Sequence, residues 1–148
     1  MASRRTKRPA GELGPADYET LAAWRFALRR FLAFSDDAAE TVGLTQQQYL
    51  AMLIIKASRE PVTIGLLAEQ LLVKHHSAVG LVDRLVQLGL VRRDASKLDR
   101  RKVAIRFTAR GARVFARLAA MQRGELRRIG PDLARFMDFF SRASDGKP

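Results

Sequence analysis

Apolar residues recur along most of this chain at the spacing of an amphipathic helix. The pattern is clear between Ala16 and Phe34, where one apolar face is about 100° wide on a helical wheel and consists of Leu21, Trp24, Leu28, Phe31 and Leu32. Phe26 falls on the opposite side of the same helix. A large aromatic residue opposite an apolar face indicates that the helix is covered from two directions, by a second subunit or around a ligand cavity.

The stretch "GLTQQQYLAMLIIKA" predicts the start of a second helix. Thr45 suits the N-cap position, Gln48 completes a capping box, and Leu44 with Tyr49 can form a hydrophobic staple. After a break at Pro61, the pattern predicts a short helix over 64–72 capped by Thr63, and then a second helix that runs to about residue 88. Two short helices joined by a brief turn predict a helix-turn-helix.

A hairpin is predicted directly after this motif. Gly89 ends the preceding helix, and the two strand candidates are Leu90–Arg93 and Lys102–Phe107, joined by the polar tip "DASKLDR". A helix-turn-helix followed by two strands is the winged variant of the motif. Thr108 is then expected to cap the next helix, which continues to Ile129.

Gly130 and Pro131 are expected to interrupt that helix, because proline cannot extend the preceding turn but suits the start of a new one. A last amphipathic helix follows, with Leu133, Phe136, Met137 and Phe140 on one face. The predicted fold is therefore mainly α (α+β). It has a winged helix-turn-helix at about 45–108 with a two-stranded wing, flanking helices at about 16–35 and 109–142, and a flexible basic arm over 1–15.

Composition limits the classes of protein that this chain can represent. Its 148 residues are enough for a single domain, here 16–148, with its own core. The chain has 27 Lys and Arg against 15 Asp and Glu, a formal charge of +12 that favours a polyanionic partner. Cysteine is absent, which excludes disulfides, thiolate metal sites and thiol redox switches. No signal peptide and no apolar run of membrane-spanning length are found, so we expect a cytoplasmic protein.

The excess charge is concentrated at the predicted wing. Between Arg92 and Arg110 there are eight cations and two anions, a local net of +6. Such a loop can bind phosphates with release of counterions and can insert an arginine into the minor groove; a solvated face without a partner is the alternative. Asp99 is expected either to pair with Arg101 or a neighbouring cation and fix the shape of the tip, or to be an ordinary turn residue. The wing residues predicted at DNA are Arg93, Lys97, Asp99, Arg100, Arg101 and Lys102.

The helix before the wing is expected to read the major groove. Candidate reading residues lie at its N-terminal end or opposite its apolar face: Lys74, His75, His76, Ser77, Gly80 and Arg84. Adjacent histidines point about 100° apart on a helix and cannot chelate one ion as an i, i+4 pair would. No phosphate-binding glycine loop, nucleophile elbow or pair of catalytic carboxylates is found in the sequence. We therefore expect neither an enzyme nor a cofactor.

The sequence resembles the MarR family, the multiple antibiotic resistance regulators, over roughly 17–142. The likeness rests on "GLTQQQYLAMLII", on "TIGLLAEQLLVKHHSAVGLVDRLVQLGLVRR" and above all on "DRRKVAIRFTARG", which resembles that family's wing signature and Thr-x-x-Gly helix start. The resemblance implies a homodimer whose terminal helices, 16–35 and 109–142, interlock. It also implies that Arg101 enters the minor groove, that Asp99 is its ion-pair partner, and that the reading positions are His76, Ser77, Val79 and Gly80.

The same resemblance implies a regulator that binds a palindromic operator, with half-sites roughly 34 Å apart. We expect repression that is relieved by a small aromatic acid or phenol, with Trp24, Tyr49 and Met52 as candidate lining residues, although ordinary core packing also explains these three. Two other readings of the charge remain open. One is a sequence-nonspecific nucleic-acid-binding or chromatin-like protein, and the other is an interaction module with an acidic protein partner.

Overall fold

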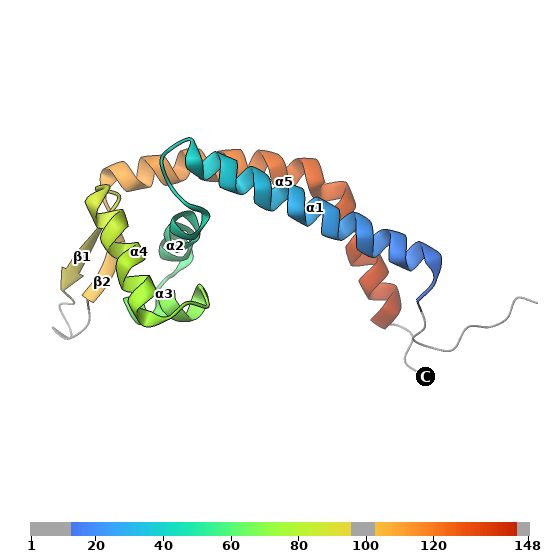
Figure 1. Ribbon diagram of the computed structural model, residues 1–148, viewed down its shortest axis with the longest axis horizontal. Helices are drawn as coiled ribbons and strands as arrows, with labels where there is room; N and C mark the ends of the chain where they lie inside the picture. Colours follow the sequence, from blue (N-terminus) through green and yellow to red (C-terminus); the bar gives the residue numbers. More distant parts are fainter. Residues whose placement is uncertain (1–12, 96–102, 145–148) are drawn as a thin grey trace, which may run out of the picture. The chain divides into compact units, whose positions relative to one another are not determined.

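The computed structural model describes residues 13–95 and 103–144. Helices dominate, and the two strands form one antiparallel hairpin in which Val91 lies opposite Phe107 and Ala95 opposite Val103 (Figure 1). The mainly helical winged fold expected from the sequence is confirmed. In chain order the elements are α1 (Pro15–Glu40), α2 (Gln46–Ala57), α3 (Ile64–Gln70), α4 (His75–Gln87), β1 (Val91–Ala95), β2 (Val103–Phe107) and α5 (Ala109–Ser144).

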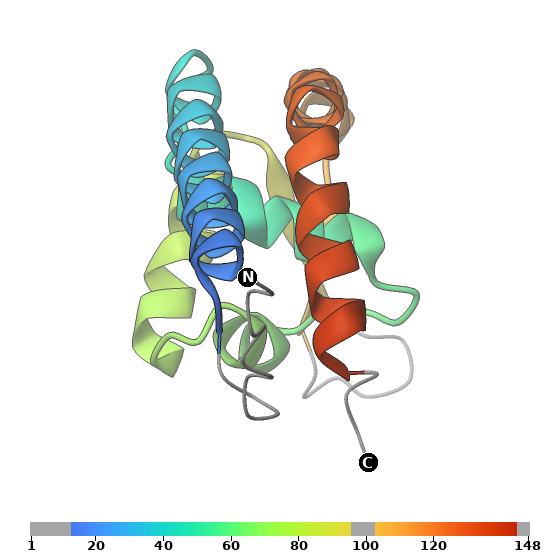
Figure 2. The same cartoon turned by 90° about the vertical axis from the view of Figure 1, so that its right-hand side faces the viewer.

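The chain divides into two compact units. Residues 34–123, called here the winged unit, contain α2, α3, α4, the hairpin, the end of α1 and the first part of α5. The terminal unit is described over 13–33 and 124–144, the remaining parts of α1 and α5. Figure 2 shows these two helices of the terminal unit side by side, as the two long ribbons nearest the viewer. Their contact includes Trp24 stacked on Phe136, with ring centroids 4.7 Å apart.

Short-range capping signals define the helix starts in the winged unit. Thr45 accepts a hydrogen bond from the Gln48 backbone N–H, and the Gln48 side chain accepts one from the Thr45 N–H, so the predicted capping box is confirmed. Thr63 caps α3 in the predicted way, accepting from the backbone N–H of Leu66. Each cap satisfies amide groups that have no partner inside the helix.

Helix α4 ends as the sequence predicted. Gly89 has a φ of +67°, its N–H donates to Val86 O, and the N–H of Leu90 donates to Leu85 O. This pair of hydrogen bonds around a left-handed residue is the Schellman motif, for which glycine has no steric penalty. The turn sends the chain directly into β1.

Nearly every element of the winged unit contributes side chains to its core. Its largest fully buried side chains are Met52, Leu67, Val82, Leu85, Val91, Ile105 and Leu118. They come from α2, α3, α4, both strands and α5. Burial of the apolar face of each short helix stabilises it, because helices of this length are marginal alone.

The first helix is longer than the sequence predicted. Its expected end at Phe34 was wrong, since α1 continues to Glu40. Ser35 is buried and its hydroxyl accepts a hydrogen bond of 2.8 Å from the Gln122 side-chain amide. Ala38 and Ala39 are also buried. Packing against α5 therefore overrides the local preference of the polar residues.

The expected interruption at Gly130 and Pro131 was also wrong, because α5 is one helix from Ala109 to Ser144 with Pro131 inside it. A proline in a helix removes one i to i−4 hydrogen bond and crowds the preceding turn. The neighbouring turn is held by other contacts, including buried Ile129 and the ion pair between Glu125 and Arg128. At the other end of the chain, α1 starts at Pro15, one residue inside the segment expected to be a flexible arm.

A third extended segment joins the hairpin. Val62 forms an isolated antiparallel bridge with Ile105, whose N–H donates to the Val62 carbonyl over 2.7 Å. A single bridging residue leaves no alternating pattern in the sequence, which is why the segment was missed. The bridge ties the connection between α2 and α3 to β2.

The wing is joined to α5 through the Thr-x-x-Gly sequence. The Thr108 hydroxyl donates to Gly89 O over 2.7 Å and accepts from the Gly111 N–H over 2.9 Å, while the Thr108 N–H donates to Leu90 O. One side chain therefore caps α5 and binds it to the end of α4. Gly111 lies so close to Leu90 that a side chain does not fit there.

Over residues 13–95 and 103–144, no helix combines the length and the apolar character needed to cross a membrane.

Candidate nucleic-acid interface

Helix α4 has one buried face and one exposed face. Ala78, Val82 and Leu85 are buried and belong to the apolar face of the helix. Val79 is half-buried. The other proposed reading residues are all exposed: Lys74, His75, His76, Ser77, Gly80 and Arg84. The structure therefore brings these candidate residues together on one solvent-facing surface, with Val79 at its edge.

The N-terminus of α4 differs from the starts of α2, α3 and α5. Lys74 stands at the N-cap position with extended backbone and makes no side-chain cap hydrogen bond. In the other three helices a threonine hydroxyl fills this role. The first turn of α4 contains no acidic residue, as in α2, α3 and α5. The partial positive charge of a helix N-terminus normally attracts an anion and is unfavourable beside a lysine. This end of α4 is therefore electrostatically suited to an external anion.

Gly80 lies in the middle of α4 without an intramolecular reason. A Cβ built at this position has no atom within 4 Å, so packing inside the chain does not require glycine. Glycine in a helix interior costs about 1 kcal/mol relative to alanine. The exposed backbone at Gly80 gives a partner close access to the helix.

Ion pairs hold the cations at the base of the hairpin. Arg93 binds Asp83 of α4 over 2.7 Å, which links β1 to the reading helix. Asp94 lies 3.1 Å from the Arg92 guanidinium and 3.5 Å from that of Arg106. Arg93, expected to meet DNA directly, is thus already bound to a carboxylate. The sequence did not reveal this role of Asp83, because its contact with Arg93 depends on the packing of β1 against α4.

The other wing residues predicted at DNA, namely Lys97, Asp99, Arg100, Arg101 and Lys102, lie outside the described residues. The strand ends that flank them, Ala95 and Val103, are described. Figure 1 shows these strand ends and the N-terminus of α4 on the same side of the winged unit, the lower side in that view. The geometry therefore presents two features on one side, the exposed α4 surface and the open end of a cationic hairpin.

The three residues proposed for an effector pocket are all engaged in packing. Tyr49 and Met52 are buried in the winged unit, and the Tyr49 ring stacks on Phe115 with centroids 5.9 Å apart. Burial raises the pKa of the Tyr49 phenol. Trp24 belongs to the terminal unit, where it stacks on Phe136. None of the three lines either of the two hollows described in these units; their role as a ligand pocket stays a prediction.

Helices α3 and α4 form a helix-turn-helix in which α4 has an exposed N-terminal surface, and a cationic hairpin follows. This arrangement defines a winged helix-turn-helix protein, a class that binds DNA. Residues 42–102 match the model of the MarR family. The resemblance seen in the sequence is thereby confirmed over this part of the chain.

Solved structures share the fold over nearly the whole chain. RV1404 from Mycobacterium tuberculosis is 26% identical, with a TM-score of 0.68, covering 93% of this chain and 98% of its own. AbsC, a MarR family transcriptional regulator from Streptomyces coelicolor, is 20% identical, with a TM-score of 0.68 and 93% of each chain covered.

A mutant of MepR from Staphylococcus aureus bound to an oligodeoxyribonucleotide is 17% identical, with a TM-score of 0.65, covering 90% of this chain and 94% of its own. No curated protein sequence matches the chain.

Proposed function

We propose that the chain is a homodimeric repressor that binds a palindromic operator and is released by a small aromatic or phenolic ligand. The observation that carries the DNA-binding part is the start of α4, where Lys74, His75, His76 and Ser77 surround a helix N-terminus that has no side-chain cap and no acidic residue. Duplex DNA supplies the anion that this end of the helix favours.

The two parts of the interface have different roles in the proposal. Backbone amides at the start of α4 and Lys74 bind phosphates and set the register of the helix. The exposed side chains of His76 and Ser77 then face base edges in the major groove, and Gly80 allows the groove wall to approach the helix backbone. Arg84, one turn further along, reaches either a phosphate or a guanine.

The wing supplies further cations in this proposal. Arg101, the proposed minor-groove residue, belongs to the segment between the strand ends at Ala95 and Val103. The ion pair between Arg93 and Asp83 supports this arrangement, because it fixes β1 on α4 and with it the spacing between groove-reading helix and wing.

Exposed apolar side chains of the terminal unit support a dimer. Phe26 is 64% exposed, Tyr18 61% and Met137 55%, which is unusual for large apolar side chains gathered on two helices. Leu32, Leu126 and Leu133 add to this surface. A second copy would bury it, and two-fold symmetry would present two reading helices to a palindrome. Light scattering behind a sizing column tests this, with a mass of about 33 kDa, twice the 16.6 kDa chain, as the expected result.

Footprinting on the DNA upstream of this protein's own coding region tests operator recognition. The expected result is protection of an imperfect inverted repeat. A random duplex at the same salt concentration is the control, because nonspecific binding has the steep salt dependence without sequence preference. Equal affinity for both duplexes would favour the chromatin-like alternative, and protection of neither would refute DNA binding.

Ligand release is tested on the same complex. A small aromatic acid or phenol that lowers operator affinity 100-fold must favour the DNA-free conformation by about 2.7 kcal/mol. If a broad panel of such compounds leaves the footprint unchanged, release by this ligand class is refuted while operator binding stands.

A further inference from the structure

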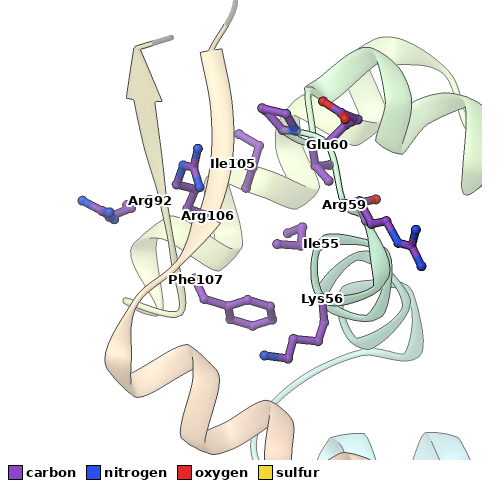
Figure 3. A pocket seen from close by; sticks show the side chains of 11 residues that line it. Ile55, Lys56, Arg59, Glu60, Arg92, Ile105, Arg106 and Phe107 are labelled. Carbon is purple, nitrogen blue, oxygen red and sulfur yellow. The ribbon is translucent and has the colours of Figure 1, made fainter. Parts of the chain in front are cut away.

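A groove on the winged unit is lined by none of the residues proposed to bind DNA. It has a volume of about 460 Å³ and lies between the end of α2, the segment 58–62 and the hairpin (Figure 3). The main-chain bridge between Val62 and Ile105 holds its two sides together. The size is within the range of small-molecule sites. None of the predicted effector residues lines it.

Apolar side chains form the floor of the groove, whereas most of its exposed lining is polar. Val62 and Ile105 are buried in it, and Ile55 and Phe107 are half-buried. Figure 3 shows the Ile55 side chain and the Phe107 ring on opposite sides of the hollow. The Phe107 ring packs against the Phe115 ring, with centroids 5.6 Å apart. A flat apolar group placed between Ile55 and Phe107 would displace water and contact these two apolar side chains, which favours binding.

The rim carries an excess of positive charge. Lys56, Arg59, Arg92 and Arg106 line the groove together with a single carboxylate, Glu60. Asp94 is bound to Arg92 and Arg106, so four cations face two carboxylates and the groove keeps a net charge of +2. Within the described part of the chain, Lys56 and Arg59 have no ion-pair partner. The chemistry is therefore complementary to an anion.

The side chains differ in direction. In Figure 3 the Lys56 side chain points toward the side of the hollow where Phe107 lies, whereas the guanidinium groups of Arg59 and Arg92 point away from the hollow. Arg106 is held by Asp94. Lys56 is thus the cation placed to contact a bound molecule. The arginines contribute mainly to the positive electrostatic potential of the groove.

We propose that this groove binds a small organic anion, with its charged group on the Lys56 ammonium and its flat apolar body between Ile55 and Phe107. The ligand class combines a carboxylate or a similar anion with an aromatic or alicyclic body. The proposal goes beyond operator binding and does not require it, since all the contacts lie within one winged unit.

The test uses 1-naphthoate as the probe and the methyl signals of isoleucine in the full-length protein. Titration without DNA is expected to shift the Ile55 and Ile105 signals saturably, while Ile129 of the terminal unit is unaffected. The neutral 1-naphthamide should bind at least tenfold more weakly, because it lacks the charge. Inorganic phosphate, which lacks the apolar body, should bind weakly as well.

Two matched variants separate a defined contact from general attraction by a basic protein. Lys56→Gln should weaken naphthoate binding about tenfold, which corresponds to about 1.4 kcal/mol. Lys74→Gln removes the same charge at the start of α4 and should leave naphthoate affinity within twofold of wild type. Both lysines are exposed, so neither change disturbs the core.

The proposal is overturned if Ile55 and Ile105 do not respond to millimolar naphthoate, if naphthamide or phosphate binds equally well, or if the two lysine variants have the same effect. Failure of this test is distinct from failure of the proposed function, because operator binding by the wild-type protein is measured in a separate footprint without any ligand.

Discussion

Replacing Gly111 by alanine introduces a methyl group where the winged unit has no room for one. A Cβ at this position lies 1.8 Å from the Leu90 carbonyl oxygen, 2.7 Å from its carbonyl carbon and 3.0 Å from its Cα. All three are main-chain atoms, so no side-chain rotation relieves the overlap. The start of α5 and the chain at Leu90 must separate, and we therefore expect Gly111→Ala to be strongly destabilising.

The magnitude follows from what the separation breaks. Ordinary contact begins near 3.4 Å, so the two segments must move apart by roughly 1.5 Å. The hydrogen bond from the Thr108 N–H to Leu90 O, now 3.0 Å, is then lost, and the Thr108 cap on Gly111 is distorted. One hydrogen bond and one cap contribute about 1 kcal/mol each, and overpacking adds about 1–3 kcal/mol. The expected loss is about 3 kcal/mol or more.

Thermal denaturation followed by circular dichroism measures this loss. For a chain of this size it corresponds to a fall in Tm of roughly 6–12 °C. Protein concentration must be the same in all samples, because association raises the apparent stability. Gly80→Ala is the matched control: the built Cβ has no neighbour within 4 Å, and the residue is exposed in mid-helix. This control should raise stability by about 1 kcal/mol.

The reasoning is refuted if Gly111→Ala melts within 2 °C of wild type, or if both alanine variants behave alike. Either result would mean that the junction between α5 and the hairpin adapts easily. The Thr-x-x-Gly sequence would then mark a helix cap only, without a close contact between main chains.

Three further predictions concern strain, DNA contact and pH. Leu72 follows α3 with a φ of +56°, a left-handed conformation that favours glycine, and its side chain is 93% exposed. Leu72→Gly should therefore raise the free energy of unfolding, measured in urea, by about 0.5–1 kcal/mol. A loss of stability would refute backbone strain at this position. Lys74→Gln should make the slope of log affinity against log salt less negative by about 0.9 if Lys74 binds a phosphate, while Lys56→Gln leaves it unchanged. The hydrogen bond from Arg128 lowers the pKa of Glu125, so its contribution to stability is complete above the ordinary glutamate pKa and is lost as pH falls through the lowered value. The difference in Tm between wild type and Glu125→Gln should therefore be largest near neutral pH and disappear in strong acid; a constant difference would contradict this assignment.

Much of the site was predictable because its signals are local. The exposed residues of α4 follow from the periodicity of Ala78, Val82 and Leu85, since a buried stripe defines the opposite face by geometry alone. The ion pair of Arg93 with Asp83 was not predictable in this way. Those residues meet only because the turn at Gly89 brings β1 back along α4, which is a consequence of three-dimensional packing.

The starts of α2 and α3 and the end of α4 could be inferred from the chain itself. Their caps depend on Thr45, Thr63 and Gly89, and each acts on residues within four positions. An interaction of this kind forms in a short segment regardless of the rest of the molecule, so its pattern is visible in the order of residues.

Contacts between distant segments produced the features that the chain pattern did not reveal. Helix α1 continues past Phe34 because Ser35 binds Gln122, and the groove above Ile55 and Phe107 exists because Val62 pairs with Ile105. Pro131 stays inside α5 although its own preference favours a break. Local preferences are worth about 1–3 kcal/mol per residue, and burial against a neighbouring element contributes as much or more. Where local preference and tertiary packing favour different conformations, packing therefore determines the structure.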